Sequence, residues 1–242
     1  DILLKLLGQL VLVYLEGDFF GEIAVLGNHK RTATVAATLE SHVLEFSKEK
    51  LVQGFVLCPH LEGRLFQFYM LRLFLHFAPQ HPYFGTFDEE ALSQFFYFLQ
   101  PCRAKAGNVL IEQGAKSSSL YFILEGLVSI EKDSLPVDDL GPGEFVGEMA
   151  LLTGGARTAR VTTKTTCDYL ECPDYMFEPL IKQFPTLKDW LQKTSTTRLS
   201  EMKIQIEMPK ACASPYNISG SRVKNAKLGH QPIVKIELQA VQ

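Results

Sequence analysis

The stretch that decides the fold is Gly143-Glu144-Phe145-Val146-Gly147-Glu148-Met149-Ala150-Leu151-Leu152, and it occurs twice. The earlier copy reads Gly17-Asp18-Phe19-Phe20-Gly21-Glu22-Ile23-Ala24-Val25-Leu26. A short loop and an Arg-Thr-Ala triplet follow each copy, Arg31-Thr32-Ala33 in the first and Arg157-Thr158-Ala159 in the second. Matching residues lie 126 positions apart (148 − 22). This distance is the length of a domain and is far longer than a solenoid repeat.

The composition is that of a globular protein with a core of ordinary size. Of the 242 residues, 46% are hydrophobic and 21% are charged, and the net charge is −3. A chain of this length holds one or two domains, and its charge gives no basic footprint of the kind that nucleic-acid-binding proteins carry. The 5 cysteines include no Cys-x-x-Cys pair. They therefore predict neither disulfides nor a zinc site, and favour a reducing, cytoplasmic location.

Strands are expected on both sides of the first copy. The apolar run Leu10–Leu15 precedes it, and the segments Thr32–Ala37 and His42–Phe46 follow it around a polar turn. Ser47 is placed to cap a short helix that begins at Lys48. The second copy has a long run of strands before it and the first does not. We therefore expect the first domain to be incomplete at its N-terminal side.

The segment Leu61–Phe77 is the most hydrophobic of the chain. A membrane-spanning helix needs about 20 apolar residues, whereas this run is shorter and is interrupted by charged side chains such as Arg64 and Arg72. The segment therefore predicts a helix buried between two domains, without membrane insertion.

Short strands separated by glycine turns dominate the region around the second copy. Three strands, Asn108–Glu112, Leu120–Leu124 and Leu127–Glu131, precede the motif, with a loop predicted over Asp133–Pro136. Two more, Arg160–Thr163 and Cys167–Glu171, follow it. Short strands at such spacing predict a sandwich or a barrel. Helical patterning precedes these strands, where Asp88 is placed to cap a helix, and it returns after the last strand.

Each copy of the motif combines groups that suit a phosphorylated sugar. Gly21 lets the backbone approach a ligand closely, and a short helical turn from Ile23 offers free amides to an anion. Arg31 adds a fork of donors that matches a phosphate. Glu22 can accept hydrogen bonds from a sugar hydroxyl. An anion site and a hydroxyl acceptor in one pocket indicate a nucleotide as the ligand.

The pattern Phe-Gly-Glu-Ile-Ala, followed by Arg-Thr-Ala nine residues after the Glu (31 − 22), resembles the phosphate-binding cassette of cyclic nucleotide-binding domains. That family includes the regulatory subunit of the cAMP-dependent kinase, the cGMP-dependent kinase, gated channels and the bacterial catabolite activator. The resemblance implies an α+β, mainly β protein with two jelly-roll-like β-rolls and flanking helices. It covers nearly the whole chain to about Leu191.

The resemblance also implies the ligand-binding residues. Glu22 and Glu148 would accept the ribose 2′-hydroxyl, and Arg31 and Arg157 would pair with the cyclic phosphate. With the surrounding backbone, the candidate set is Gly21, Glu22, Ile23, Ala24, Arg31, Thr32 and Ala33 in the first copy, and Gly147, Glu148, Met149, Ala150, Arg157, Thr158 and Ala159 in the second. We expect no catalytic residue, no metal and no cofactor besides the ligand.

The choice between cAMP and cGMP stays open. A threonine at the position of Thr32 and Thr158 touches the guanine in cGMP-selective members of the family, but some cAMP-responsive members also carry it. Tyr69 and Trp190 are candidates for the side chain that covers the base, although core packing is favoured for each.

The sequence divides into four parts in this interpretation: 1–60, the C-terminal part of a first domain; 61–86, a connecting helix; 87–206, a complete second domain; and 207–242, a linker and a strand that enters a further domain or docks on a partner. We expect a non-catalytic sensor or regulatory module of a larger protein, which binds cAMP or cGMP at two sites and contacts other protein chains or domains. The alternatives are a ligand-free scaffold in a large assembly and the regulatory part of a cyclic nucleotide-dependent kinase.

Overall fold

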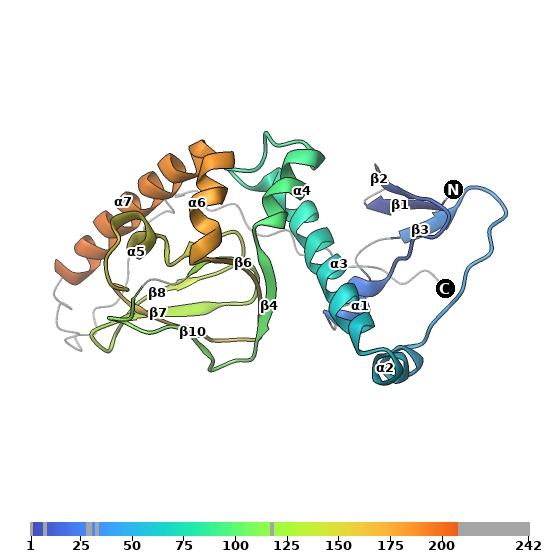
Figure 1. Cartoon of the computed structure of the whole chain (residues 1–242), viewed down its shortest axis with the longest axis horizontal. Helices are drawn as coiled ribbons and strands as arrows, with labels where there is room; N and C mark the ends of the chain where they lie inside the picture. The colour runs from blue at the N-terminus through green and yellow to red at the C-terminus, as the bar shows by residue number, and fades with distance from the viewer. Residues whose placement is uncertain (1, 7–8, 28–30, 32–33, 117–118, 208–242) are drawn as a thin grey trace, which may run out of the picture.

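A computed structural model of the chain describes residues 2–6, 9–27, 31, 34–116 and 119–207. Its strands fall into two groups, a large one and a small one, and the long helix α3 (Pro59–Phe77) runs between them (Figure 1). Of the predicted linker and strand over 207–242, all but residue 207 lie outside the described residues. The domain boundaries stay a prediction.

The second group of strands forms a β-roll of two antiparallel sheets. The strand order is β4-β11-β6-β9 in one sheet and β5-β10-β7-β8 in the other. The strands are β4 (Gln100–Ala104), β5 (Val109–Ile111), β6 (Ser119–Glu125), β7 (Val128–Lys132), β8 (Leu135–Leu140), β9 (Phe145–Val146), β10 (Arg160–Thr163) and β11 (Cys167–Pro173). The predicted strands of this region are therefore confirmed, with shifts of a few residues at their ends.

The loop predicted over Asp133–Pro136 is confirmed at its first two residues and is wrong at Leu135 and Pro136. Asp133 and Ser134 alone make the turn, with φ angles of 52° and 64°, and β8 begins at the next residue. Pro136 lies inside β8, on the outer strand of its sheet. A proline is tolerated there because an edge strand has one side without a ladder partner.

Four helices accompany the second roll: α4 (Glu89–Tyr97), α5 (Glu148–Thr153), α6 (Asp174–Gln183) and α7 (Pro185–Glu207). The carboxylate of Asp88 accepts a hydrogen bond of 2.8 Å from the amide of Ala91, which confirms the predicted N-cap of α4. Helices α6 and α7 lie along one side of the roll, and α5 sits next to α7 (Figure 1).

The first group of elements repeats the second at a constant offset of 126 residues. It comprises β1 (Ile2–Leu6), β2 (Gln9–Tyr14), α1 (Glu22–Leu26), β3 (Thr34–Ala37) and α2 (Lys48–Leu57). In order, these elements correspond to β7, β8, α5, β10 and α6, and α3 corresponds to α7. The sheet order β2-β1-β3 also matches β8-β7-β10. The repeat therefore extends well beyond the motif, over strands and helices alike.

The strand predicted over His42–Phe46 is wrong, because this segment has no regular structure. Its counterpart β11 lies between β4 and β6, and the described residues of the first copy include no counterpart of either strand. Without neighbours the segment has no ladder partner. Leu44 is 86% exposed, whereas Leu170 at the same position of the second copy is 0% exposed. In the described residues the first copy is thus a partial roll.

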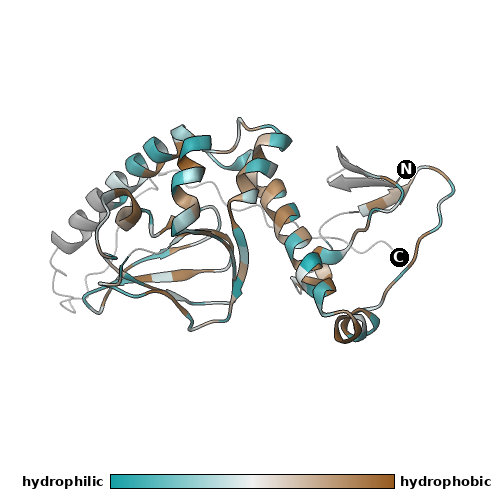
Figure 2. Cartoon of the chain, viewed as in Figure 1, coloured by the Kyte–Doolittle hydropathy of each residue, from teal (hydrophilic) through white to brown (hydrophobic). Residues whose placement is uncertain are grey.

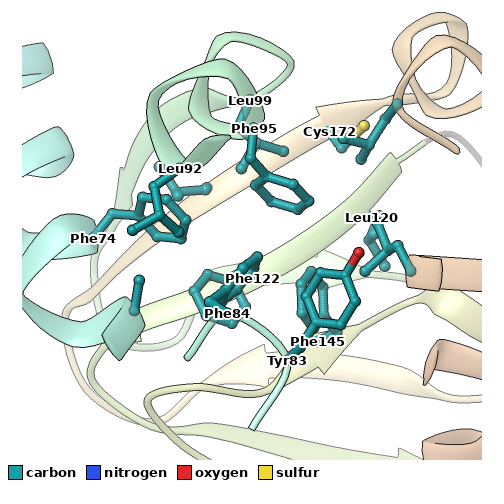
Figure 3. Packing of buried hydrophobic residues seen from close by; sticks show 14 of the residues in the cluster. Phe74, Tyr83, Phe84, Leu92, Phe95, Leu99, Leu120, Phe122, Phe145 and Cys172 are labelled. Carbon is teal, nitrogen blue, oxygen red and sulfur yellow. The ribbon is translucent and has the colours of Figure 1, made fainter. Parts of the chain in front are cut away.

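Helix α3 is buried against the second roll, as its apolar sequence predicts. Tyr69, Met70 and Phe74 have no exposed surface. The ring of Phe74 lies 5.2 Å from that of Phe84 between centroids, in an edge-to-face arrangement. Figure 3 shows Phe74 beside the aromatic cluster around Phe84 and Phe122, and Figure 2 shows the hydrophobic residues along α3. In the described part of the chain no helix has both the length and the apolar character needed to cross a membrane.

Candidate functional site

The seven candidate residues of the second copy line a single pocket in the second roll. The pocket has a volume of about 120 Å³. Its lining comprises Gly147, Glu148, Met149, Ala150, Arg157, Thr158 and Ala159, together with Ile111, Ile130, Val137, Leu140, Val146 and Val161 and the basic side chains Lys132 and Arg198. The pocket is therefore aliphatic on its walls and carries a concentration of positive charge at its polar side.

Gly147 brings the polar groups together because its backbone adopts a conformation that other residues avoid. Its φ is 89°, in the left-handed region, and helix α5 begins at the next residue. A Cβ at this position would collide with Nη1 of Arg157. Gly21 repeats the arrangement: its φ is 92°, and a Cβ at this position would collide with Nη1 of Arg31. The glycine is needed both for the turn and for the approach of the arginine.

Arg157 is a buried cation whose described partners are all neutral. Only 5% of it is exposed. Nη1 donates a hydrogen bond of 2.6 Å to the carbonyl oxygen of Gly147, and Nη2 donates to the carbonyl oxygen of Ser119. Within the described residues Arg157 forms no ion pair with a carboxylate, and burial lowers the pKa of its guanidinium. A charge in this situation is costly unless an anion compensates it.

Glu148 is held by two side chains of α7. The Ser195 hydroxyl lies 3.0 Å from Oε1 of Glu148, and Nη1 of Arg198 lies 3.6 Å from the same oxygen. Arg198 also donates a hydrogen bond of 2.6 Å to the carbonyl oxygen of Phe145 and pairs with Glu144 at 3.1 Å. Glu148 is 5% exposed and lines the pocket, and its contacts with Ser195 and Arg198 of α7 fix the position of its carboxylate.

The first copy places Glu22 and Arg31 in the same relation to Gly21. Nη1 of Arg31 donates to the carbonyl oxygen of Gly21 at 3.1 Å, as Arg157 does to Gly147, but Arg31 is exposed. Nη1 of Arg72, on α3, lies 2.9 Å from Oε1 of Glu22 and donates at 2.8 Å to the carbonyl oxygen of Phe19. Oε2 of Glu22 is buried and has no hydrogen-bond partner among the described residues.

Each helix that follows a motif contributes an arginine that is absent from the predicted sites. Arg72 and Arg198 are 126 residues apart (198 − 72), the same offset as Glu22 and Glu148. The same offset, applied to the helices after the motifs, identifies these two arginines in the sequence. Arg72 also stands out because it interrupts the apolar run Leu61–Phe77. The motif contains neither arginine, so its pattern alone does not predict them.

The remaining candidates have three outcomes. Thr158 lines the pocket, and its hydroxyl lies 3.8 Å from the sulfur of Met149. Thr32 and Ala33 lie outside the described residues. Tyr69 and Trp190 pack in the hydrophobic core, Tyr69 fully buried and Trp190 with its ring 5.6 Å from that of Phe145.

The described residues hold no cluster of three or more His, Cys, Asp or Glu side chains that could bind a metal ion.

Comparison with known proteins gives matches over most of both copies. A family model described as the cyclic nucleotide-binding domain matches residues 7–55 and 101–184, more than half of the chain. The chain is 32% identical over 117 residues to a cyclic nucleotide-gated potassium channel of Rhizobium etli, a match that covers 48% of this chain and 33% of the channel. It is 26% identical over 162 residues to a cAMP-dependent protein kinase regulatory subunit of Dictyostelium discoideum, with 64% of this chain and 47% of that protein covered.

Among solved structures, the regulatory subunit of a cAMP-independent protein kinase A from Trypanosoma brucei is 21% identical, with a TM-score of 0.49. The match covers 84% of this chain and 72% of that one. The chain spans about a third of the length of the bacterial channel and about half that of the Dictyostelium protein.

Proposed function

Because the chain belongs to the cyclic nucleotide-binding domain family, we propose that it binds cAMP or cGMP at two sites as a non-catalytic regulatory module. One site is the pocket around Glu148 and Arg157. The other is formed around Glu22 and Arg31, at the same positions of the first copy.

The buried charge of Arg157 is the observation that carries this proposal. The guanidinium is fixed by two carbonyl oxygens, lines an open pocket and has no carboxylate partner among the described residues. An anion that enters the pocket supplies the missing negative charge, and a phosphate matches the fork of donors. A cyclic phosphate carries one negative charge and needs one such cation.

Glu148 supports a nucleotide rather than a free phosphate as the ligand. A carboxylate cannot bind a phosphate, but it accepts a hydrogen bond from a hydroxyl. Ser195 and Arg198 hold Oε1 from the side of α7, which orients the carboxylate before a ligand arrives. The aliphatic walls of the pocket, including Ile130 and Leu140, suit the flat faces of a base.

The test is titration calorimetry of the 242-residue chain with cAMP and with cGMP. We expect two equivalents of the preferred nucleotide to bind. Replacing Arg157 by Ala removes a charge-assisted hydrogen bond worth about 1.5–3 kcal/mol, so affinity at the second site should fall by a factor of ~10 to 150 while the first site keeps its affinity. Arg31→Ala should have the reverse effect.

A matched control is Arg160→Ala. Arg160 is a neighbouring arginine on β10 whose ion pair with Glu112, at 3.6 Å, is exposed. Its loss should change neither affinity. A folded chain that binds neither nucleotide at high micromolar concentration would refute the proposal and leave the scaffold as the better account. Equal loss at both sites in Arg157→Ala would refute the assignment of the sites.

The effector stays a separate proposal. The Dictyostelium relative is a kinase regulatory subunit and the Rhizobium relative is a channel. We propose that this chain, like them, acts on other protein domains, and co-purification of a kinase chain would favour the first of these two roles.

A further inference from the structure

Arg103 belongs to the second roll but contacts the first copy of the motif. It lies on β4, the outer strand of its sheet. Its Nη1 donates a hydrogen bond of 2.8 Å to the carbonyl oxygen of Leu26. Leu26 is the last residue of α1, the short helix that begins with Glu22. One side chain thus joins two segments that are 77 residues apart in the sequence.

Two buried groups hold Arg103 in this position. Its Nε and Nη2 donate to the two carboxylate oxygens of Asp168 at 2.6 and 2.7 Å, a two-pronged contact that fixes the plane of the guanidinium. The hydroxyl of Tyr69, on α3, donates to Oδ2 of Asp168 at 2.7 Å. The guanidinium also lies over the ring of Phe66, 5.2 Å from its centroid. Asp168 is buried, with 3% of its surface exposed.

The comparison of the two copies shows that, in the described part of the chain, this arrangement occurs at the first site and not at the second. Tyr69 occupies the position of Ser195 (195 − 69 = 126). The hydroxyl of Ser195 donates a hydrogen bond to Glu148 of its own copy, whereas the hydroxyl of Tyr69 donates one to Asp168 of the other roll. Helix α3 therefore holds Glu22 through Arg72 and, one turn earlier, holds the Asp168–Arg103 pair through Tyr69.

We propose that Arg103 is a positioning residue for the first nucleotide site, so that the second roll completes the first site. This inference rests on the proposed function of the first copy. The last carbonyl groups of a helix lack partners within the helix, and a cation near them is favourable. Since α1 spans only 5 residues, the hydrogen bond from Arg103 to Leu26 at its end also restrains Glu22 at its start.

The test measures each site separately. First-site affinity is measured in an Arg157→Ala background and second-site affinity in an Arg31→Ala background, with the nucleotide that the wild-type chain prefers. Arg103→Ala should weaken the first site about five- to tenfold, because the first site loses the charge-assisted hydrogen bond to α1. The second site should stay within twofold, because the bonds to Asp168 that are also lost lie outside the lining of its pocket. Intact second-site binding also shows that the roll containing Arg103 is still folded.

Two further variants separate positioning from stability. Tyr69→Phe keeps the ring packing but removes the hydroxyl from Asp168, and should weaken the first site in the same direction by a smaller factor. Lys164→Ala breaks an exposed ion pair of 2.6 Å with Asp139 in the same roll and should alter neither site. Equal weakening of both sites by Arg103→Ala, or none at the first, would overturn the proposal.

A second readout needs no ligand. In wild type the amide of Gly27 donates a hydrogen bond of 3.0 Å to the carbonyl oxygen of Ile23, at the end of α1. Arg103→Ala should raise the hydrogen-exchange rate of this amide at least about tenfold. An unchanged rate would contradict a positioning role even if neither nucleotide binds, so failure here is distinct from failure of the proposed function.

Discussion

Arg72 and Arg198 make the same contact in the two halves of the chain. Nη1 of Arg72 donates to the carbonyl oxygen of Phe19 at 2.8 Å, and Nη1 of Arg198 donates to that of Phe145 at 2.6 Å. Arg72 also pairs with Glu22, and Arg198 pairs with Glu148. These glutamates lie three residues after Phe19 and Phe145. Each helix that follows a motif is therefore tied to its own motif by one arginine. A movement of the motif on ligand binding would therefore move that helix as well.

Gly147→Ala should abolish most of the second-site affinity. The new methyl group would collide with Nη1 of Arg157 and displace the guanidinium from the pocket. We expect a loss of at least about tenfold, the value of one charge-assisted hydrogen bond, measured by calorimetry. The control is Gly107→Ala, whose φ of 85° imposes similar backbone strain but whose methyl group would meet no atom within 4 Å. Similar losses of affinity in both variants would contradict the explanation.

Ser195→Ala should destabilise the chain more than its neighbour Thr196→Ala. Both hydroxyls bond a carbonyl oxygen one turn back in α7, at 2.8 Å each, but only that of Ser195 also reaches Glu148. Loss of a buried partner of a charged group costs about 1–3 kcal/mol, whereas an exposed substitution costs less than about 0.5 kcal/mol. Urea unfolding measures both. Equal effects would show that Ser195 does not stabilise Glu148.

His81 should make the stability of the chain fall in mild acid. Its Nδ1 accepts a hydrogen bond of 3.1 Å from the amide of Tyr83, and its Nε2 then donates to the carbonyl oxygen of Gly143 at 2.9 Å. Burial is the main cause that lowers the pKa of His81 below its usual value near 6.5.

The sign follows from this direction. The unfolded chain takes up a proton near pH 6.5 and the folded chain does so only at lower pH, so the stability contributed above pH 6.5 is lost as the pH falls. The slope can approach about 1.4 kcal/mol per pH unit. His81→Gln should flatten the dependence of the free energy of unfolding between pH 7 and 5, and the exposed His60→Asn should not. An unchanged slope in His81→Gln would assign the acid sensitivity to other groups.

Leu170→Ala should lower the stability of the chain far more than Leu44→Ala, although both residues occupy the same position of the repeat. Leu170 is enclosed between neighbouring strands, and its truncation should cost about 2–5 kcal/mol. Leu44 lies on an irregular, exposed segment, so its truncation in the 242-residue chain should change stability by less than about 0.5 kcal/mol. Chemical denaturation gives both values. A large loss at Leu44 would mean that this side chain is covered in solution.

Much of the fold was predictable because it depends on local patterns. Ser47 and Asp88 cap helices as expected, and the alternation of short strands and glycine turns around the second motif is confirmed. The failures occurred where the outcome depends on neighbours. His42–Phe46 has the composition of a strand, but a strand forms only beside another, and none lies alongside it in the described residues. The loop predicted over Asp133–Pro136 is a turn of two residues, Asp133 and Ser134.

The sequence by itself determined the repeat, its family and the candidate residues of both motifs, because the 126-residue offset and the Gly-Glu and Arg-Thr-Ala spacing are properties of the chain alone. Only the tertiary structure showed that the two copies differ in their surroundings. Arg157 is buried while Arg31 is exposed, and Tyr69 bonds the other roll where Ser195 bonds its own motif. Burial and partners depend on which distant segments pack together, and no local pattern records that.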